Sequence, residues 1–169
     1  MSSFDDIYEE HEKSVFNIAL HFVRNISDAE EITQDVFLKV YLGYENFKNQ
    51  SKLSTWIHRI TVNSSIDYLR KKNAEKRRFV ISMSDAILPA NSNYIHPGIQ
   101  LEQKEALEEI LKVINELPNQ QKTAIILHKI EGLSQLKTAK IMNKSVKSVE
   151  SLIGRARKKI KENIQKAKG

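Results

Sequence analysis

The sequence predicts an all-α protein made of two small helical domains joined by a flexible linker. In both halves of the 169-residue chain, apolar residues recur at helical spacings of three and four, and no stretch alternates long enough to indicate a β-strand. Residues 79–100 lose this period and contain two of the three prolines. We therefore expect domains at residues 1–83 and 101–169, with the linker at residues 84–100.

The first domain is expected to begin with two helices and a loop. The first helix covers residues 4–22. The second is predicted to start at Ser27, because Ser27 and Glu30 have the spacing of a capping box, and to end near Tyr44. The polar residues 45–52 then form a loop. The apolar positions of the second helix are Ala29, Ile32, Val36, Phe37, Val40 and Tyr41, and its outward positions are Glu30, Glu31, Gln34 and Asp35.

A third helix is expected over residues 53–78. Its apolar face comprises Leu53, Trp56, Ile57, Ile60, Ile66 and Leu69, and its polar face comprises His58, Arg59, Asn63, Ser64 and Asp67. The helix ends in the sequence RKKNAEKRR, which contains six cations. Such a run is typical of a solvated helix end, because cations favour the C-terminus of a helix, and it is equally suited to holding phosphates.

The second domain is predicted to open with two further helices. A clear apolar period starts near Leu101 and stops at Pro118. Pro118 can open the next helix, at residues 119–130, and Gly132 ends it.

Residues 132–161 have the form of a helix-turn-helix. Two short amphipathic segments are separated by Asn143 and Lys144, and each segment is preceded by a serine that can cap it, Ser134 or Ser145. The apolar positions are Leu136, Ala139, Ile141 and Met142 in the first segment, and Val146, Val149, Leu152, Ile153, Ala156 and Ile160 in the second.

The polar face of the last segment is suited to a DNA major groove. It combines small or bidentate groups, which can reach base edges, with cations that can hold phosphates. Gly154 lies on this face although glycine costs about 1 kcal/mol relative to alanine inside a helix, which favours a close approach to the backbone there. An ordinary solvated basic helix is the alternative. The residues of this face are Lys147, Glu150, Ser151, Gly154, Arg155 and Lys158.

The charges alternate along the chain. Residues 1–50 carry 4 basic and 10 acidic side chains, whereas residues 131–169 carry 11 basic and 3 acidic ones. A second basic block lies at residues 51–100, within a formal net charge of +6. This pattern indicates two surfaces that face polyanions and an acidic surface for another partner.

The sequence lacks the usual signals of an enzyme or a membrane protein. It has no cysteine, its five histidines are scattered, and its glycines form no phosphate-binding loop. We therefore expect no catalytic residue, no metal and no cofactor. The N-terminus is acidic without an apolar core of a signal peptide, and the longest aliphatic run, Ala124–Leu127, is far too short to cross a bilayer. We expect a cytoplasmic protein with no membrane insertion.

Four blocks closely resemble the extracytoplasmic-function (ECF) group of bacterial RNA polymerase sigma factors, of the sigma-70 family. Residues 28–41 resemble the helix that binds polymerase, and residues 47–70 resemble the reader of the −10 promoter element. Residues 116–130 and 131–159 resemble the domain that reads the −35 element. The four blocks occur in the family's order with an irregular linker between them, and together they cover nearly the whole chain.

The resemblance implies a role for each surface. The first domain would bind core polymerase and melt the −10 element, and the second would read the −35 element. The implied partners are the largest-subunit clamp helices and the flap of core RNA polymerase, promoter DNA and an anti-sigma factor. The implied site residues are, for polymerase, Glu31, Ile32, Gln34 and Asp35; for the −10 element, Phe47, Asn63, Arg59, Arg70 and Lys71; and for the −35 element, Lys147, Ser148, Glu150, Ser151, Gly154, Arg155 and Lys158.

Two positions depart from the family pattern, and two other functions compete. The family often has basic residues where this chain has Glu150 and Leu152, so we expect its −35 sequence to differ from the commonest one of the group. Trp56 is expected to pack in the core rather than contact DNA.

A stand-alone helix-turn-helix regulator would leave the first domain unexplained. An enzyme such as a nuclease would need a metal-binding cluster that the sequence lacks.

Overall fold

The structure is a computed structural model that describes residues 3–48, 50–82 and 101–168. All regular structure within these ranges is helical, which confirms the predicted all-α class. The chain divides into two compact units, Met1–Tyr94 and Ile95–Gly169, which we describe separately. The predicted linker at residues 84–100 lies outside the described residues, and its boundaries stay a prediction.

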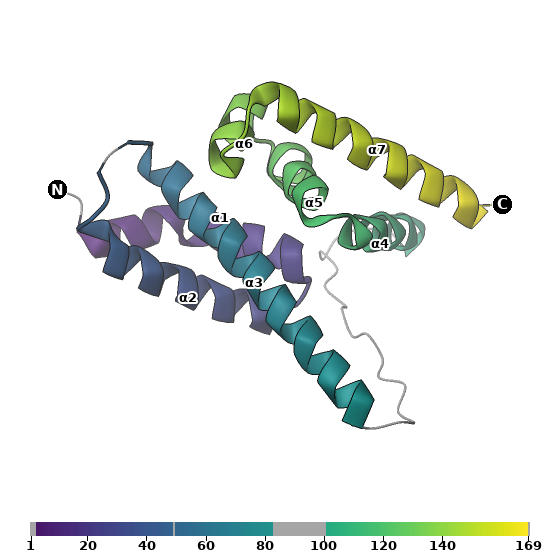
Figure 1. Ribbon diagram of the computed structural model, residues 1–169, viewed down its shortest axis with the longest axis horizontal. Helices are drawn as coiled ribbons and strands as arrows, with labels where there is room; N and C mark the ends of the chain where they lie inside the picture. Colours follow the sequence, from purple (N-terminus) through teal and green to yellow (C-terminus); the bar gives the residue numbers. More distant parts are fainter. Residues whose placement is uncertain (1–2, 49, 83–100, 169) are drawn as a thin grey trace. The chain divides into compact units, whose positions relative to one another are not determined.

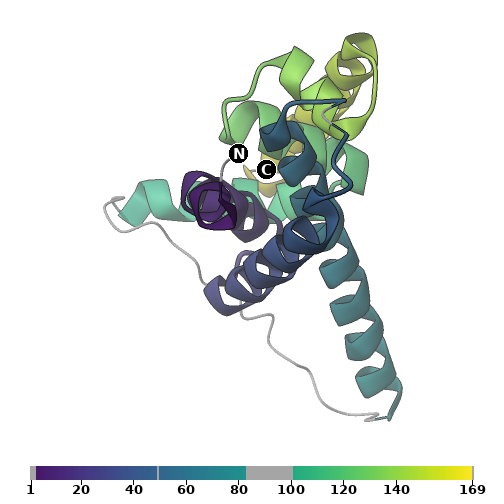
Figure 2. The same cartoon turned by 90° about the vertical axis from the view of Figure 1, so that its left-hand side faces the viewer.

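The first unit is a bundle of α1 (Phe4–Val23), α2 (Ile26–Tyr44) and α3 (Leu53–Ser82), in which each helix packs on the other two (Figures 1 and 2). Apolar side chains from all three helices close the core, because each helix presents one apolar stripe to the centre. The core residues are Ile7, Val15, Ala19, Leu20, Ala29, Ile32, Val36, Phe37, Val40 and Ile57.

The last turns of α3 leave the bundle. In both views α3 extends past the ends of α1 and α2 (Figures 1 and 2). Lys72 is half-buried, whereas residues 73–79 are all exposed. The predicted end at Arg78 falls four residues short, since the helix continues to Ser82.

The predicted capping box at Ser27 is wrong. The residue that caps α2 is Asn25, whose side-chain oxygen accepts a hydrogen bond from the backbone N–H of Asp28 at 2.9 Å. Arg24 ends α1 in a left-handed conformation with φ 55°, and Asn25 is extended, so the chain turns before Ser27 is reached. Ser27 then lies inside the first turn, where it is too late to cap.

Within residues 101–168, the second unit comprises five helical segments around its own core. They are α4 (Leu101–Glu116), α5 (Asn119–Ile125), a π-helical turn η1 (Ile126–Ile130), α6 (Gln135–Met142) and α7 (Val146–Lys168). The side chains buried between them are Ile114, Leu117, Ala124, Ile125, Ala139, Val149, Leu152, Ile153 and Ala156.

The predicted helix over residues 119–130 ends in the wider π-helical turn. The N–H of Glu131 bonds the carbonyl of Ile126 at 2.9 Å, and Gly132 follows in a left-handed conformation with φ 68°. The Nδ1–H of His128 donates to the carbonyl of Leu133 at 2.7 Å and so closes the turn. The chain thereby reverses towards α6 without leaving these polar groups unpaired.

The predicted caps of the helix-turn-helix are confirmed. The hydroxyl oxygens of Ser134 and Ser145 each accept a backbone N–H three residues on, from Lys137 and Ser148, at 3.1 Å. Asn143 ends α6 in a left-handed conformation with φ 53°. This tight turn holds α6 against α7.

Several predicted faces are corrected by the packing. Tyr41, Leu136 and Val146, assigned to apolar stripes, are 61%, 56% and 38% exposed. His58 and Ser64, assigned to a polar face, are buried, because α3 packs on both α1 and α2 and so has a wide inner face. Ser14 Oγ and His58 Nε2 lie 2.9 Å apart across that contact.

Among the described helices, none combines the length and apolar character needed to cross a bilayer.

Candidate functional site

One face of α2 carries the polar, mostly acidic residues expected to bind polymerase. Glu31, Gln34 and Asp35 are exposed at spacings of three and four, so they lie side by side on the helix. Ile32 is only 2% exposed and belongs to the core, so its side chain is not available to a partner. Its place in the predicted polymerase surface is corrected for that reason.

Apolar residues continue the same face of α2, and the sequence interpretation missed them. Leu38, Tyr41 and Leu42 are 58%, 61% and 68% exposed, and they follow Gln34 at helical spacing. A signal was present: Val36, Phe37 and Val40 already supply the core stripe, so a second apolar stripe on this helix had to face outwards. We call these outward residues the α2 face: Glu31, Gln34 and Asp35 form its mostly acidic first half, and Leu38, Tyr41 and Leu42 form its apolar second half.

Asp35 is paired within the protein. Lys39 Nζ donates to Asp35 Oδ2 at 2.7 Å and to the buried hydroxyl of Ser64 on α3 at 2.8 Å. Lys39 and Asp35 side chains are 47% and 48% exposed, and such exposed ion pairs contribute little to stability. A cationic partner can therefore compete with Lys39 for Asp35 at small cost.

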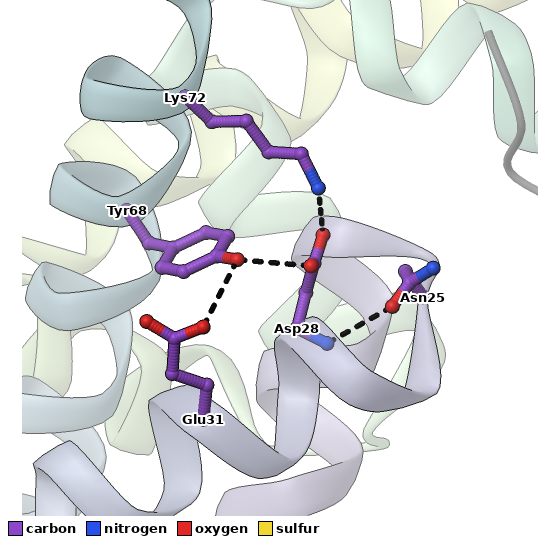
Figure 3. A network of polar contacts seen from close by, with 5 residues as sticks. All are labelled: Asn25, Asp28, Glu31, Tyr68 and Lys72. Atoms are coloured by element: carbon purple, nitrogen blue, oxygen red, sulfur yellow. Dashed lines mark hydrogen bonds and ion pairs between the residues drawn. The ribbon is translucent and has the colours of Figure 1, made fainter. Parts of the chain in front are cut away.

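A polar network joins the start of α2 to α3, and Figure 3 shows its five residues. The hydroxyl of Tyr68 donates to Asp28 Oδ1 at 2.9 Å and lies 3.4 Å from Glu31 Oε2. Lys72 Nζ pairs with the other oxygen of Asp28. Burial and, next, the hydrogen bond to Asp28 raise the pKa of Tyr68, so its hydroxyl remains a donor. We call Asp28, Tyr68 and Lys72 the α2–α3 clasp.

A hollow of about 640 Å³ lies beside the clasp, between α2 and α3. The structure brings together here two sets of residues expected to act on different partners. Glu31 and Asp35 line it from α2, and Arg70 and Lys71 line it from α3. Arg70 also lies 3.3 Å from Asp67 in an exposed ion pair.

A second hollow, of about 540 Å³, surrounds Phe47 at the start of α3. The ring of Phe47 stacks on Trp56, with centroids 5.0 Å apart and planes 29° apart. Trp56 is partly buried against the core and also lines the hollow, together with Arg59. The expectation of a purely core role for Trp56 is therefore incomplete. Gly43 allows this close packing, since a Cβ there would lie 3.0 Å from the indole.

Asn63 does not line that hollow. It is exposed on α3 one helical turn beyond Arg59, on the same side of the helix. The structure therefore places Phe47 and Arg59 together and leaves Asn63 adjacent.

The predicted DNA face of α7 is exposed and opposite its core stripe. Lys147, Glu150, Ser151, Gly154, Arg155 and Lys158 are exposed, whereas Ser148 is half-buried. Leu152 is 8% exposed within the core, so its departure from a basic family residue concerns packing. A Cβ added to Gly154 would meet nothing within 4 Å, and internal packing therefore does not require glycine there.

The described residues include no group of three histidine, aspartate or glutamate side chains arranged to hold a metal ion. Each surface above is instead built from charged, apolar or aromatic groups suited to binding. The sites can hold cationic, anionic and stacking partners.

Comparison with known proteins matches both units. Residues 7–75 match the family model of sigma-70 region 2, and residues 107–160 match that of sigma-70 region 4. The chain is 30% identical to the ECF RNA polymerase sigma-E factor of Haemophilus influenzae, over 96% of this chain and 88% of that protein. It is 26% identical to the ECF RNA polymerase sigma factor SigW of Bacillus subtilis, over 96% and 89%.

Two solved structures share the fold. The sigma factor RpoE of Bartonella quintana, in complex with the anti-sigma factor NepR, is 22% identical with a TM-score of 0.71, and the match covers 96% of each chain. CnrH, in complex with the cytosolic domain of CnrY, is 23% identical with a TM-score of 0.66, covering 96% of this chain and 87% of that one.

Proposed function

This chain belongs to the ECF group of sigma-70 family RNA polymerase sigma factors, and we propose how its surfaces divide the work of transcription initiation. As a sigma factor it binds core RNA polymerase and directs it to specific promoters. The main support for this division is where the two family models match. Region 2 matches the unit with the acidic α2 face, and region 4 matches the unit with the basic α7 face.

The α2 face is the proposed polymerase contact. Glu31, Gln34 and Asp35 would meet a basic surface, which the family resemblance identifies as the clamp helices of the largest subunit. Leu38 and Leu42, exposed on the same face, would add apolar area at about 25 cal/mol per Å² buried. Charge would thus set orientation, and the apolar half would add affinity.

The first unit also carries the proposed −10 site. The hollow at Phe47 would receive a base flipped from the promoter, and an aromatic face contributes about 1 to 3 kcal/mol per stacked base. Arg59 lines the same hollow, and Asn63 would extend the contact along α3. Arg70 and Lys71, exposed towards the free end of α3, would hold phosphates.

The second unit is the proposed −35 reader. α7 would lie in the major groove, with Glu150, Ser151 and Arg155 towards base edges and Lys147 and Lys158 towards phosphates. The N–H of Ser148 already bonds Ser145, so Ser148 would help to shape the entry of α7 more than it would touch a base. The polymerase flap is the proposed protein partner of this unit.

An anti-sigma factor is a further proposed partner. The sigma factor RpoE of Bartonella quintana, which shares the fold, was solved with the anti-sigma factor NepR bound. The exposed apolar residues of the α2 face favour a regulator that covers them, because large apolar side chains cluster there. We propose that the protein acts in the bacterial cytoplasm, where polymerase and promoters are, and that it performs no bond chemistry of its own.

Reconstitution tests the proposal. The purified protein should bind core polymerase and enable run-off transcription from a specific promoter. A stand-alone helix-turn-helix regulator would bind duplex DNA by itself and give no transcript with core polymerase. DNA binding without polymerase binding would therefore favour that alternative.

We expect Phe47→Ala to slow promoter opening by roughly five- to a hundredfold, because one stacked base loses its aromatic partner. Polymerase affinity should change little, since Phe47 lies away from the α2 face residues Glu31 and Asp35. Opening is measured on duplex promoters and on a pre-melted bubble, which removes the pairing cost and should partly restore the rate. Asn63→Ala tests whether the base site extends along α3. Equal opening rates for the Phe47 variant and the parent protein on duplex DNA would contradict the assignment.

We expect Gly154→Ala to stabilise the second unit by up to about 1 kcal/mol and at the same time to weaken promoter binding. The methyl group meets nothing within the described protein but would occupy space that DNA approaches. Thermal unfolding and binding to a −35 duplex measure the two effects. Gly132→Ala is the control for the unfolding measurement. The same substitution should destabilise there, because φ 68° at that residue is strained for alanine. A stabilised Gly154 variant with parental DNA affinity would place DNA elsewhere.

A further inference from the structure

Among the described side chains of α3, the α2–α3 clasp is the last point at which the helix is tied to the bundle. Beyond Lys72, residues 73–79 are exposed, and α3 projects past its neighbours (Figure 1). The cations expected to hold promoter phosphates begin at Arg70 and continue into this free end. Their direction therefore depends on how α3 is held at the clasp.

The length of α3 beyond the clasp makes its tilt at Tyr68 important. A helix rises about 1.5 Å per residue, so Arg78 lies roughly 15 Å beyond Tyr68 along α3. A tilt of ~10° at Tyr68 would move that end by roughly 2.5 Å, which is enough to break a charge-assisted hydrogen bond to a phosphate. A small change at the clasp is therefore amplified at Arg77 and Arg78, near the free end of α3, and much less at Arg70 and Lys71, which lie between Tyr68 and Lys72.

Tyr68 is the centre of the clasp. Its hydroxyl points between two carboxylates of α2, as Figure 3 shows: Asp28 at 2.9 Å and Glu31 at 3.4 Å. The ammonium group of Lys72 lies 5.7 Å from the centre of the Tyr68 ring and also pairs with Asp28. Asp28 is itself fixed, because its backbone N–H is held by the cap Asn25 and its side chain is only 15% exposed. The clasp thus ties the rigid start of α2 to the exit of α3.

We propose that Tyr68 is a positioning residue that sets the direction of the free-end cations Arg77 and Arg78 of α3 relative to the polymerase-facing α2 face. This inference rests on the proposed function of both surfaces. Because Glu31 belongs to the α2 face and also meets Tyr68, the two surfaces share one side chain. Polymerase and promoter are then held in a fixed relation by a hydroxyl that need not touch either.

The test substitutes Tyr68→Phe, which removes the hydroxyl and keeps the ring. The matched control is Tyr8→Phe, because the Tyr8 hydroxyl also donates to a carboxylate, Glu12 at 2.8 Å, but within α1 alone. Promoter affinity of the complete polymerase complex is measured at several salt concentrations. We expect Tyr68→Phe to lower it about two- to tenfold, the effect of one hydrogen bond, and Tyr8→Phe to leave it unchanged.

A combined variant separates positioning from general weakening. Arg77→Ala with Arg78→Ala should reduce the salt slope by about two units in the parent protein, and by less than about one unit when Tyr68 is already phenylalanine. An equal reduction in both backgrounds would overturn the positioning role alone. No reduction in the parent would show that the free-end cations do not meet phosphates, which would overturn the proposal. Arg70→Ala with Lys71→Ala, measured in the same way, tests the proposed −10 assignment separately. If Tyr68→Phe does not fold, Asp28→Asn provides the same comparison through the other partner of the bond.

Discussion

Replacing Gln34 and Asp35 by lysine is expected to lower affinity for core RNA polymerase by at least about thirtyfold, because like charges facing each other across an interface cost several kcal/mol. Gln34→Lys is the cleaner single change, since Gln34 is exposed and has no hydrogen-bond partner within the described residues. Asp35→Lys places a second cation beside Lys39, which costs a few tenths of a kcal/mol on the helix itself. The fold should survive both changes, since both side chains lie on the outer face.

The measurement is equilibrium binding of labelled protein to core polymerase, with thermal unfolding as a check on the fold. Glu9→Lys is the matched control, because it makes the same charge change as Asp35→Lys at an exposed position of α1. The control should bind polymerase within about twofold of the parent, a difference of under ~0.5 kcal/mol. If the Gln34 and Asp35 variants also bind as the parent does, at an unchanged melting temperature, polymerase does not contact this part of α2.

The helices could be predicted from sequence because periodicity and caps are local signals. Ser134 and Ser145 cap as expected, since each serine is followed at once by an amphipathic segment. The cap of α2 was placed wrongly because two nearby residues, Asn25 and Ser27, offered cap chemistry, and the backbone conformation of Arg24 and Asn25 decided between them. That choice depends on how α1 and α2 pack, which a local pattern does not contain.

The outward residues were harder to predict where packing from two sides decides burial. Ile32 matches a family surface but lies in the core, and Tyr41 fits an apolar stripe but is exposed. The clasp could not be predicted, because its hydrogen bonds join residues 40 and 44 positions apart. Sequence spacing indicates neighbours on one helix, whereas contacts between helices need the fold.

On α7, the sequence pattern identifies the outward residues and the fold explains one departure from the family pattern. The sequence pattern and the resemblance both assigned Glu150 and Arg155 to this face, and both residues are exposed. Neither makes an ion pair in the part of the chain that the structure describes, so both charges can meet a partner. Leu152, one of the two departures from the family pattern, is explained by the core. Glu150 remains as the departure that can alter promoter choice.

Arg155→Ala is expected to cost about 1 to 3 kcal/mol in promoter binding and to relax preference at one position of the −35 element, because arginine can bond a guanine edge with two hydrogen bonds. Glu150→Arg should raise affinity for all DNA and change the preferred −35 sequence, since an acid that repels phosphate and accepts from cytosine is replaced by a cation. Both side chains are exposed, so the second unit should keep its melting temperature.

A randomised −35 library, transcribed by polymerase carrying each variant, measures the preferences, and binding at several salt concentrations measures the charge effect. Lys158→Ala and Lys159→Ala are the controls, because both residues are exposed cations of α7. Each should weaken all promoters alike and lower the salt slope by about one unit without changing the preferred sequence. If the Arg155 and Glu150 variants give the parental preference profile, α7 is not the helix that reads the −35 bases. A changed profile in those two variants, with an unchanged one in the lysine variants, separates base reading from phosphate binding on a single helix face.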